Sequence, residues 1–112
     1  MTQNRNKLID LFMGNIVNSI VHQVLEKAVN DEMAVRYRKE LTTSFDIAKK
    51  YRNKINPLNR PFFDREVLYI KEQIIKRVRG ELLLRISKGY ENINLDLIEE
   101  LVDDSLKKLN II

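Results

Sequence analysis

The chain has 112 residues, of which 44% are hydrophobic and 32% charged, and its formal net charge is +4. This length predicts a single helical domain over residues 1–112, and the apolar content is sufficient for a core rather than a disordered chain. Because the chain has no cysteine, its sequence excludes disulfides, thiol catalysis and cysteine-ligated zinc.

No apolar run approaches the roughly 18 residues that a membrane-spanning helix needs. Asp10 and Asn15 interrupt the one candidate stretch near the N-terminus. A membrane span and a signal peptide are therefore not expected, and the sequence is interpreted as that of a cytoplasmic protein with no membrane partner.

The first predicted helix runs from Asn4 to Val29, with a broad apolar side whose members recur at helical spacing. On this helix, Gly14 is expected to allow a close helix approach. The opposite side is polar and carries His22, which we interpret as a surface histidine. His22 and Glu26 lie one turn apart, but two ligands without a third do not make a metal site.

The second predicted helix runs from Asp31 to Lys54, after a break at Asn30-Asp31. Small and aromatic residues recur three or four apart along it, with Ser44 at the centre. This narrow seam favours a helical hairpin over a deep core position.

Two prolines then interrupt the helical pattern between Asn56 and Phe63. The apolar residues Leu58, Phe62 and Phe63 in this segment have two interpretations. They either pin a packed connector to the body or form an exposed docking motif. Together with the terminal Ile111 and Ile112, they are our candidates for contact with a protein partner.

The third predicted helix is capped by Asp64 and ends near Lys88, with Gly89 where a helix-terminating glycine is expected. It carries two apolar stripes. One contains Ile70, Ile74 and Val78 among others, and the second consists of Leu68, Ile75 and Leu83. Because both sides are apolar, we expect this to be the central helix.

The fourth predicted helix runs from Asn94 to Leu109, with acidic residues in its first half and Lys107 and Lys108 in its last turn, as the helix dipole favours. No segment has the pattern of a strand. The sequence therefore predicts an all-α fold, a small antiparallel bundle of about four helices.

Charge is unevenly distributed along the chain. Between Arg36 and Lys88 there are fifteen Lys or Arg and six Asp or Glu, whereas between Glu91 and Asp104 there are six acids and no base. A positive stripe on a helix is typical of proteins that contact phosphates without reading bases. The alternative is a solvated face, partly neutralised by the acidic fourth helix. The candidate nucleic-acid-binding residues are Arg36, Lys39, Lys49, Lys50, Arg52, Lys54, Lys76, Arg77 and Arg79.

No catalytic signature is present. The only histidine has no partner pattern around a serine, and the three glycines do not form a phosphate-binding loop. The sequence therefore predicts a non-enzymatic protein with no cofactor and no metal.

Two main functional hypotheses follow. The first is a basic accessory subunit of a nucleic-acid-associated complex, which contacts phosphates non-specifically through the second and third helices. The second is a protein-interaction or homodimerising bundle with no nucleic-acid role. A third possibility is a regulator whose acidic last helix mimics or blocks nucleic acid.

Overall fold

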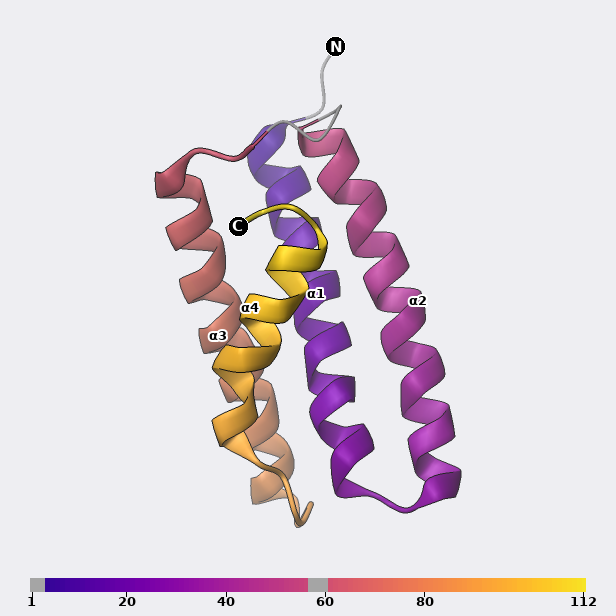
Figure 1. The fold of residues 1–112 in the computed structure, drawn as a ribbon. Coiled ribbons are helices and arrows are strands. Elements are labelled where there is room, and N and C mark those ends of the chain that lie inside the picture. The colour runs from indigo at the N-terminus through magenta and orange to yellow at the C-terminus, as the bar shows by residue number, and fades with distance from the viewer. Residues whose placement is uncertain (1–3, 57–60) are drawn as a thin grey trace.

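The computed structural model describes residues 4–56 and 61–112. Its secondary-structure elements within these ranges are helices (Figure 1). The helices are α1 (Arg5–Ala28), α2 (Asp31–Ile55), α3 (Asp64–Ser87) and α4 (Ile98–Lys108), and a short 3₁₀ turn, η2 (Leu95–Leu97), leads into α4. Within the described ranges there is no strand. The predicted all-α bundle of four helices is confirmed.

The central helix is α1 and not α3, which corrects the sequence-based expectation. In Figure 1, α2 and α3 lie on either side of α1, and α4 lies across α1 and α3. Twelve residues of α1 are buried, against four of α3. The second apolar stripe of α3 explains the error, because the described part of the chain leaves much of it exposed: Ile75 packs against the core, but Leu68 is 58% exposed and Leu83 is 47% exposed.

α1 is long and apolar enough to cross a membrane by length and composition alone, so the expectation that no such stretch exists is wrong. However, 61% of its apolar window is buried inside the bundle. Core helices of folded bundles pass the same test when several neighbours cover them.

The seam predicted on α2 is buried or half-buried, and Ala34, Ser44 and Ala48 on it pack towards α1. Ala48 has no exposed surface. Small side chains let two helices approach closely, and this contact is the most extensive between any two elements. By contrast, a Cβ at Gly14 would have no neighbour within 4 Å, so the close approach expected there does not occur.

Asparagine side chains cap three of the helical starts. Asn4 accepts from the backbone N–H of Asn6, Asn30 accepts from that of Met33, and Asn94 accepts from that of Asp96. The Asn94 cap serves η2, because α4 itself begins later, at Ile98. The prediction for Asp64 is wrong: Phe63 occupies the N-cap position, and Asp64 is the first helical residue.

Two helices end in the same motif. At the end of α3, Gly89 has a φ of 98°, and the backbone N–H of Tyr90 donates to the carbonyl of Arg85. At the end of α4, Asn110 has a φ of 57°, and the backbone N–H of Ile111 donates to the carbonyl of Leu106. Both are Schellman motifs, which turn the following residue back onto its helix. Ile111 is buried as a consequence.

Arg52 lies inside the bundle and is only 1% exposed. Its Nε donates to the carbonyl oxygen of Leu109 at 2.8 Å, and one terminal nitrogen donates to the carbonyl oxygen of Asn56 at 2.7 Å. The guanidinium carbon lies 5.1 Å from the centre of the Phe62 ring. One α2 side chain therefore holds the end of α4, the end of α2 and the start of the α3 segment.

The burial of these residues corrects the roles that the sequence predicted for several of them. Arg52 is withdrawn from the phosphate-binding set, because its guanidinium is enclosed and already hydrogen-bonded. Phe62 and Ile111 are buried, so neither is an exposed protein contact. Phe63 and Ile112 are 77% and 48% exposed, and they remain candidates. Leu58 lies outside the described residues.

Candidate nucleic-acid interface

Four of the candidate basic residues lie on the outer face of α2. A helix repeats every 3.6 residues, so these positions project on the side opposite the buried Ala48. All four are exposed, and we call them the α2 basic face: Arg36, Lys39, Lys50 and Lys54. Within residues 4–56 and 61–112, the acidic contact that this face makes joins Arg36 to Glu40 of the same helix, at 3.7 Å. Lys54 also lies 5.4 Å from the centre of the Tyr51 ring.

Lys49 is exposed but does not belong to this face. Consecutive residues of an α-helix project about 100° apart, so Lys49 points away from the direction shared by Lys50 and Lys54. Asp46 interrupts the α2 basic face and is exposed beside it. The surface available to a phosphate backbone is therefore a single stripe, with Asp46 along its length and Glu40 beside Arg36 at one end.

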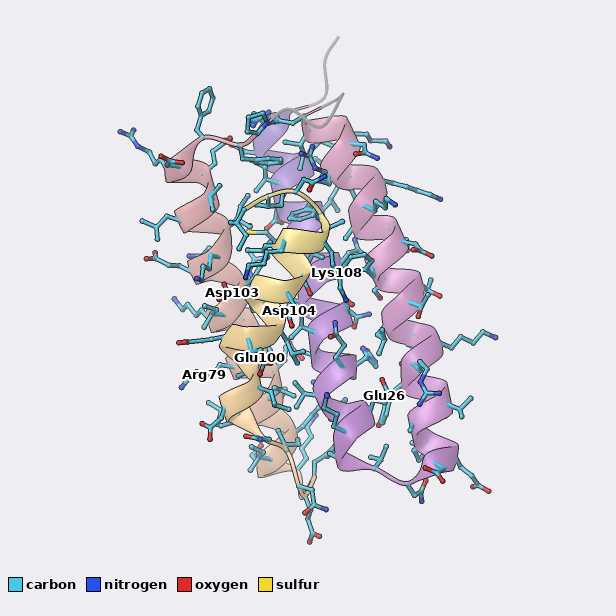
Figure 2. All side chains as sticks on the ribbon, viewed as in Figure 1. Glu26, Arg79, Glu100, Asp103, Asp104 and Lys108 are labelled. Carbon is cyan, nitrogen blue, oxygen red and sulfur yellow. The ribbon has the colours of Figure 1, made fainter. Side chains whose placement is uncertain are left out.

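The basic residues of α3 form a separate cluster. Arg77 is half-buried and its guanidinium contacts the Asp10 carboxylate of α1 at 2.9 Å. Lys76 and Arg79 are exposed, and Figure 2 places Arg79 on the α3 side of the bundle, away from α2. Because α2 and α3 lie on either side of α1, the two clusters do not combine into one continuous surface.

The acidic helix α4 does not neutralise the α2 basic face. Figure 2 shows Glu100, Asp103 and Asp104 on α4, which lies over α1 and α3. The ion pair that α4 makes within the described residues joins Asp103 to Lys71 of α3 at 2.8 Å. Hydrogen bonding to Asp103 raises the pKa of Lys71 above its ordinary value. The α2 basic face keeps its charge.

An open hollow of about 630 Å³ borders the α2 basic face. Arg36 and Lys39 stand at its rim, and polar groups from both helices line it, namely Asn18, His22, Glu40, Thr43 and Ser44. Asn18 donates its side-chain N–H to the Ser44 hydroxyl oxygen at 2.5 Å. The serine hydroxyl proton is then available to donate elsewhere, since a hydroxyl both donates and accepts.

His22 is buried against α2, which corrects its interpretation as a surface histidine. Its Nδ1 lies 2.7 Å from the carbonyl oxygen of Asn18, and its Nε2 lies 2.7 Å from a Glu40 carboxylate oxygen. The Tyr37 ring lies 5.6 Å from the imidazole, centre to centre. The sequence predicts two parts of this arrangement, because Tyr37 and Ser44 lie on the seam of α2 and His22 is one turn from Asn18. Helical spacing within α1 or α2 does not show which residues of the two helices face each other, so their contact was not predictable.

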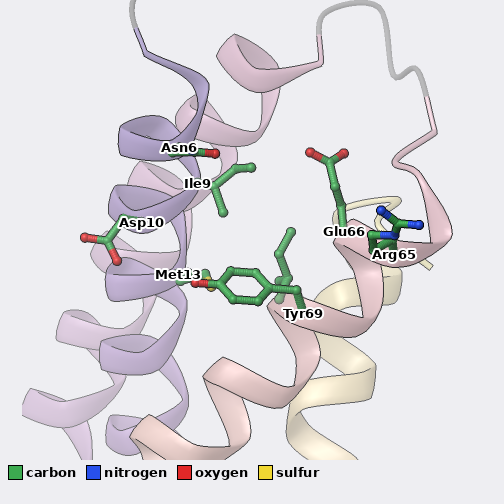
Figure 3. A pocket seen from close by; sticks show the side chains of 8 residues that line it. Asn6, Ile9, Asp10, Met13, Arg65, Glu66 and Tyr69 are labelled. Carbon is green, nitrogen blue, oxygen red and sulfur yellow. The ribbon is translucent and has the colours of Figure 1, made fainter.

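A second hollow, of about 490 Å³, lies between α1 and α3 (Figure 3). Asp10 and Glu66 line it from opposite helices, and each is bound by an arginine. Arg77 holds Asp10, and Arg5 binds Glu66 through two nitrogen–oxygen contacts of 2.8 and 2.9 Å. The hydrogen bonds from Arg5 lower the pKa of Glu66, and the same bonds raise the pKa of Arg5. Arg65 also lines this hollow, and both of its acids are paired with arginines, so we interpret it as a structural junction between α1 and α3.

Among the described residues, no three His, Asp or Glu side chains gather closely enough to hold a metal ion. Comparison of the chain with protein-family models, curated proteins and solved structures found no match. The functional argument therefore rests on the arrangement of the side chains themselves.

Proposed function

We propose that this protein is a non-enzymatic accessory subunit that binds nucleic acid without sequence specificity, through phosphate contacts on the α2 basic face. The observation that carries the proposal is the exposure of four aligned cations on a helix that the acidic α4 does not neutralise. Helices that present Lys and Arg in this way contact phosphates and carry no direct base readout. Lys76 and Arg79 of α3 would make a second, separate contact.

The test is a fluorescence-anisotropy titration against labelled DNA and RNA 20-mers at 50 and 200 mM salt. Four phosphate contacts predict a loss of about 100-fold in duplex DNA affinity between these concentrations, since each contact releases about 0.9 of a counterion. Similar affinities for unrelated sequences are expected. No binding at 50 mM salt would refute the proposal.

Charge reversal locates the contact. Lys50→Glu/Lys54→Glu should lower affinity at least tenfold at 50 mM salt. The matched control is Lys107→Glu/Lys108→Glu, which changes the net charge equally at two exposed positions of α4. An equal loss in both variants would show that net charge alone drives binding and would refute the α2 basic face.

The α3 cluster is tested separately by Lys76→Glu/Arg79→Glu. Arg77 is left unchanged because its reversal would disrupt the contact with Asp10. We expect a smaller loss than for the α2 variant, because the two faces point in different directions. Unchanged affinity would remove α3 from the phosphate-binding surface.

A second candidate function, contact with a protein through α3, is favoured by a specific observation. The outer face of α3 exposes Leu68, Leu83 and Ile86, which the rest of the described chain does not cover. Leu83 and Ile86 lie one turn apart, and exposed apolar residues that gather on one side of a helix are typical of a surface that contacts another protein. A self-associating form predicts a melting temperature that rises with protein concentration, because the associated state is stabilised by mass action.

A further inference from the structure

The outer face of α3 has a regular pattern of apolar and charged residues. Positions three or four apart share one side of a helix, and this side carries, in order, Leu68, Glu72, Ile75, Arg79, Leu83 and Ile86. We call these six residues the α3 outer stripe. Leu68, Leu83 and Ile86 are 58%, 47% and 39% exposed, while Ile75 is half-buried. The opposite side of α3 is anchored in the core through Ile70, Ile74 and Val78, which have no exposed surface.

From this pattern we infer that the α3 outer stripe pairs with the same stripe of a second copy of the chain, with the two helices antiparallel. The inference deepens the second candidate function, on which it rests, by naming the partner. It does not depend on the phosphate contacts of the α2 basic face, which lies on the other side of α1. It does use Arg79, so the second phosphate contact proposed for that residue would be made by the single copy and not by the pair.

The order of charges selects this arrangement. When two α3 helices run antiparallel with Leu68 opposite the second copy's Leu83, Glu72 stands opposite the second copy's Arg79. Twofold symmetry repeats this pair, so each dimer gains two ion pairs beside two leucine contacts. In a parallel pair every residue would meet its own equivalent, placing Glu72 against glutamate and Arg79 against arginine. Like charges in such positions disfavour the parallel pair.

The symmetry axis of the antiparallel pair passes between positions 75 and 76. Ile75 of each copy therefore lies at the centre of the interface, where an apolar residue is best shielded from water. Lys76 lies beside the axis and is exposed. Glu72 is one turn before Lys76 on the same helix, and a glutamate four residues before a lysine partly compensates the charge of that lysine. Phe63, at the start of α3 and 77% exposed, is positioned to extend the contact near the second copy's Lys88.

The first measurement is sedimentation equilibrium of the full chain between 5 and 500 µM, together with binding of an apolar fluorescent dye. We expect a monomer–dimer equilibrium that Leu68→Glu/Leu83→Glu shifts to monomer. A monomeric wild type at 500 µM overturns the self-pairing. If that monomer binds the dye more than the variant does, contact with a different protein through α3 survives. If dye binding is equal, the second candidate function fails too.

Charge reversal then tests the register. Glu72→Arg and Arg79→Glu should each weaken dimerisation at least tenfold, because each places like charges opposite one another. The double variant Glu72→Arg/Arg79→Glu should recover it, since the pairs form again with exchanged partners. Glu100→Arg on α4 is the matched control and should leave the equilibrium unchanged. Failure of the double variant to recover the dimer overturns the proposed register.

Cysteine cross-linking tests the direction of the helices, and the cysteine-free chain makes it direct. Ile75→Cys should form an intermolecular disulfide on mild oxidation, because the two positions meet at the axis. Leu83→Cys alone should not, because antiparallel pairing separates the two positions by about 22 Å along the helix. A mixture of Leu68→Cys and Leu83→Cys chains should cross-link to each other. Efficient cross-linking of Leu83→Cys alone would indicate a parallel pair and overturn the proposal.

Discussion

At the residue scale, Arg52 joins the ends of α2 and α4 to the residues that precede α3. It donates hydrogen bonds to main-chain carbonyls beyond the end of α4 and at the end of α2, in a place with almost no access to water. Carbonyl groups at helix ends have no partner within their own helix, so an enclosed end needs a donor from elsewhere. Arginine provides several donors in a fixed plane, which lets one residue bind several carbonyls.

We therefore expect Arg52→Met to lower the free energy of unfolding by about 2–4 kcal/mol, because a hydrogen bond to a charged group contributes about 1.5–3 kcal/mol and buried carbonyls would lose their donor. Urea denaturation followed by circular dichroism measures this. Lys49→Met, the neighbouring exposed position, should change stability by no more than about 0.5 kcal/mol. Equal losses in the two variants would contradict the role assigned to Arg52.

Glu66 gives a prediction that depends on pH. Its pKa in the folded chain is lowered, chiefly by the hydrogen bonds from Arg5. The unfolded chain therefore binds a proton on this group more readily than the folded chain. Ionised Glu66 stabilises the fold above the unfolded pKa, and this contribution is lost as pH falls through the lowered pKa.

Glu66→Gln should accordingly be less stable than the wild type at pH 7, by about 1 kcal/mol for the loss of a charge-assisted contact. The difference should begin to shrink as pH falls below about 4, where the unfolded carboxyl takes up a proton, and should disappear as pH falls through the lowered pKa of the folded chain. Urea denaturation at a series of pH values measures it. Glu91→Gln, exposed and outside the helices, serves as the control. A difference independent of pH would contradict the assignment.

At the element scale, the contact between α1 and α2 depends on small side chains on α2. Ala48 has no exposed surface, and Ser44 accepts a hydrogen bond from Asn18 of α1. Ala48→Leu should destabilise the fold by about 1–3 kcal/mol, because extra methyl groups in a packed contact force the neighbours to shift. Thermal denaturation measures this. Thr43→Leu, on the exposed side of α2, should be nearly neutral, and a comparable loss there would rule out overpacking as the cause.

The sequence predicts where the helices begin and end better than it predicts which of their sides are buried. Helical spacing predicted the bounds of every helix to within a few residues, because periodicity and punctuation are local signals. The same spacing gave α3 two apolar stripes, yet it contains no information about what covers each stripe. Leu68 and Leu83 were therefore expected in the core, although in the structure they are 58% and 47% exposed.

In the candidate site too, the sequence predicts properties that depend on one helix and not those that depend on contacts with another segment. Exposure of Lys39, Lys50 and Lys54 follows from their spacing opposite the seam of α2. The burial of Arg52 does not, because the carbonyl of Leu109, to which its Nε donates, lies more than fifty residues further along the chain. His22 was assigned to a polar side for a similar reason: its partner Glu40 belongs to another helix.

At the scale of the whole molecule, charge is segregated between the outer face of α2 and the exposed side of α4. The two are separated by at least one helix diameter, about 10 Å, which is comparable to the distance over which physiological salt screens charge. Under the proposed function, α4 therefore affects nucleic-acid binding only weakly at that salt concentration. In the regulator hypothesis, its acids would instead occupy or repel the nucleic acid at the site.

Neutralising three exposed acids of α4 distinguishes these two cases. Removing the helix would not, because Ile98, Val102 and Leu106 of α4 are buried in the core, and without them the apolar surfaces of α1 and α3 that α4 covers would be exposed. Glu99→Gln/Glu100→Gln/Asp104→Asn keeps those contacts and leaves the ion pair of Asp103 with Lys71 in place. For phosphate contact through the α2 basic face, anisotropy at 150 mM salt should show less than a threefold gain in affinity, growing at lower salt as screening weakens. A gain of tenfold or more at 150 mM, with unchanged circular dichroism, would instead identify α4 as an acidic helix that blocks nucleic acid.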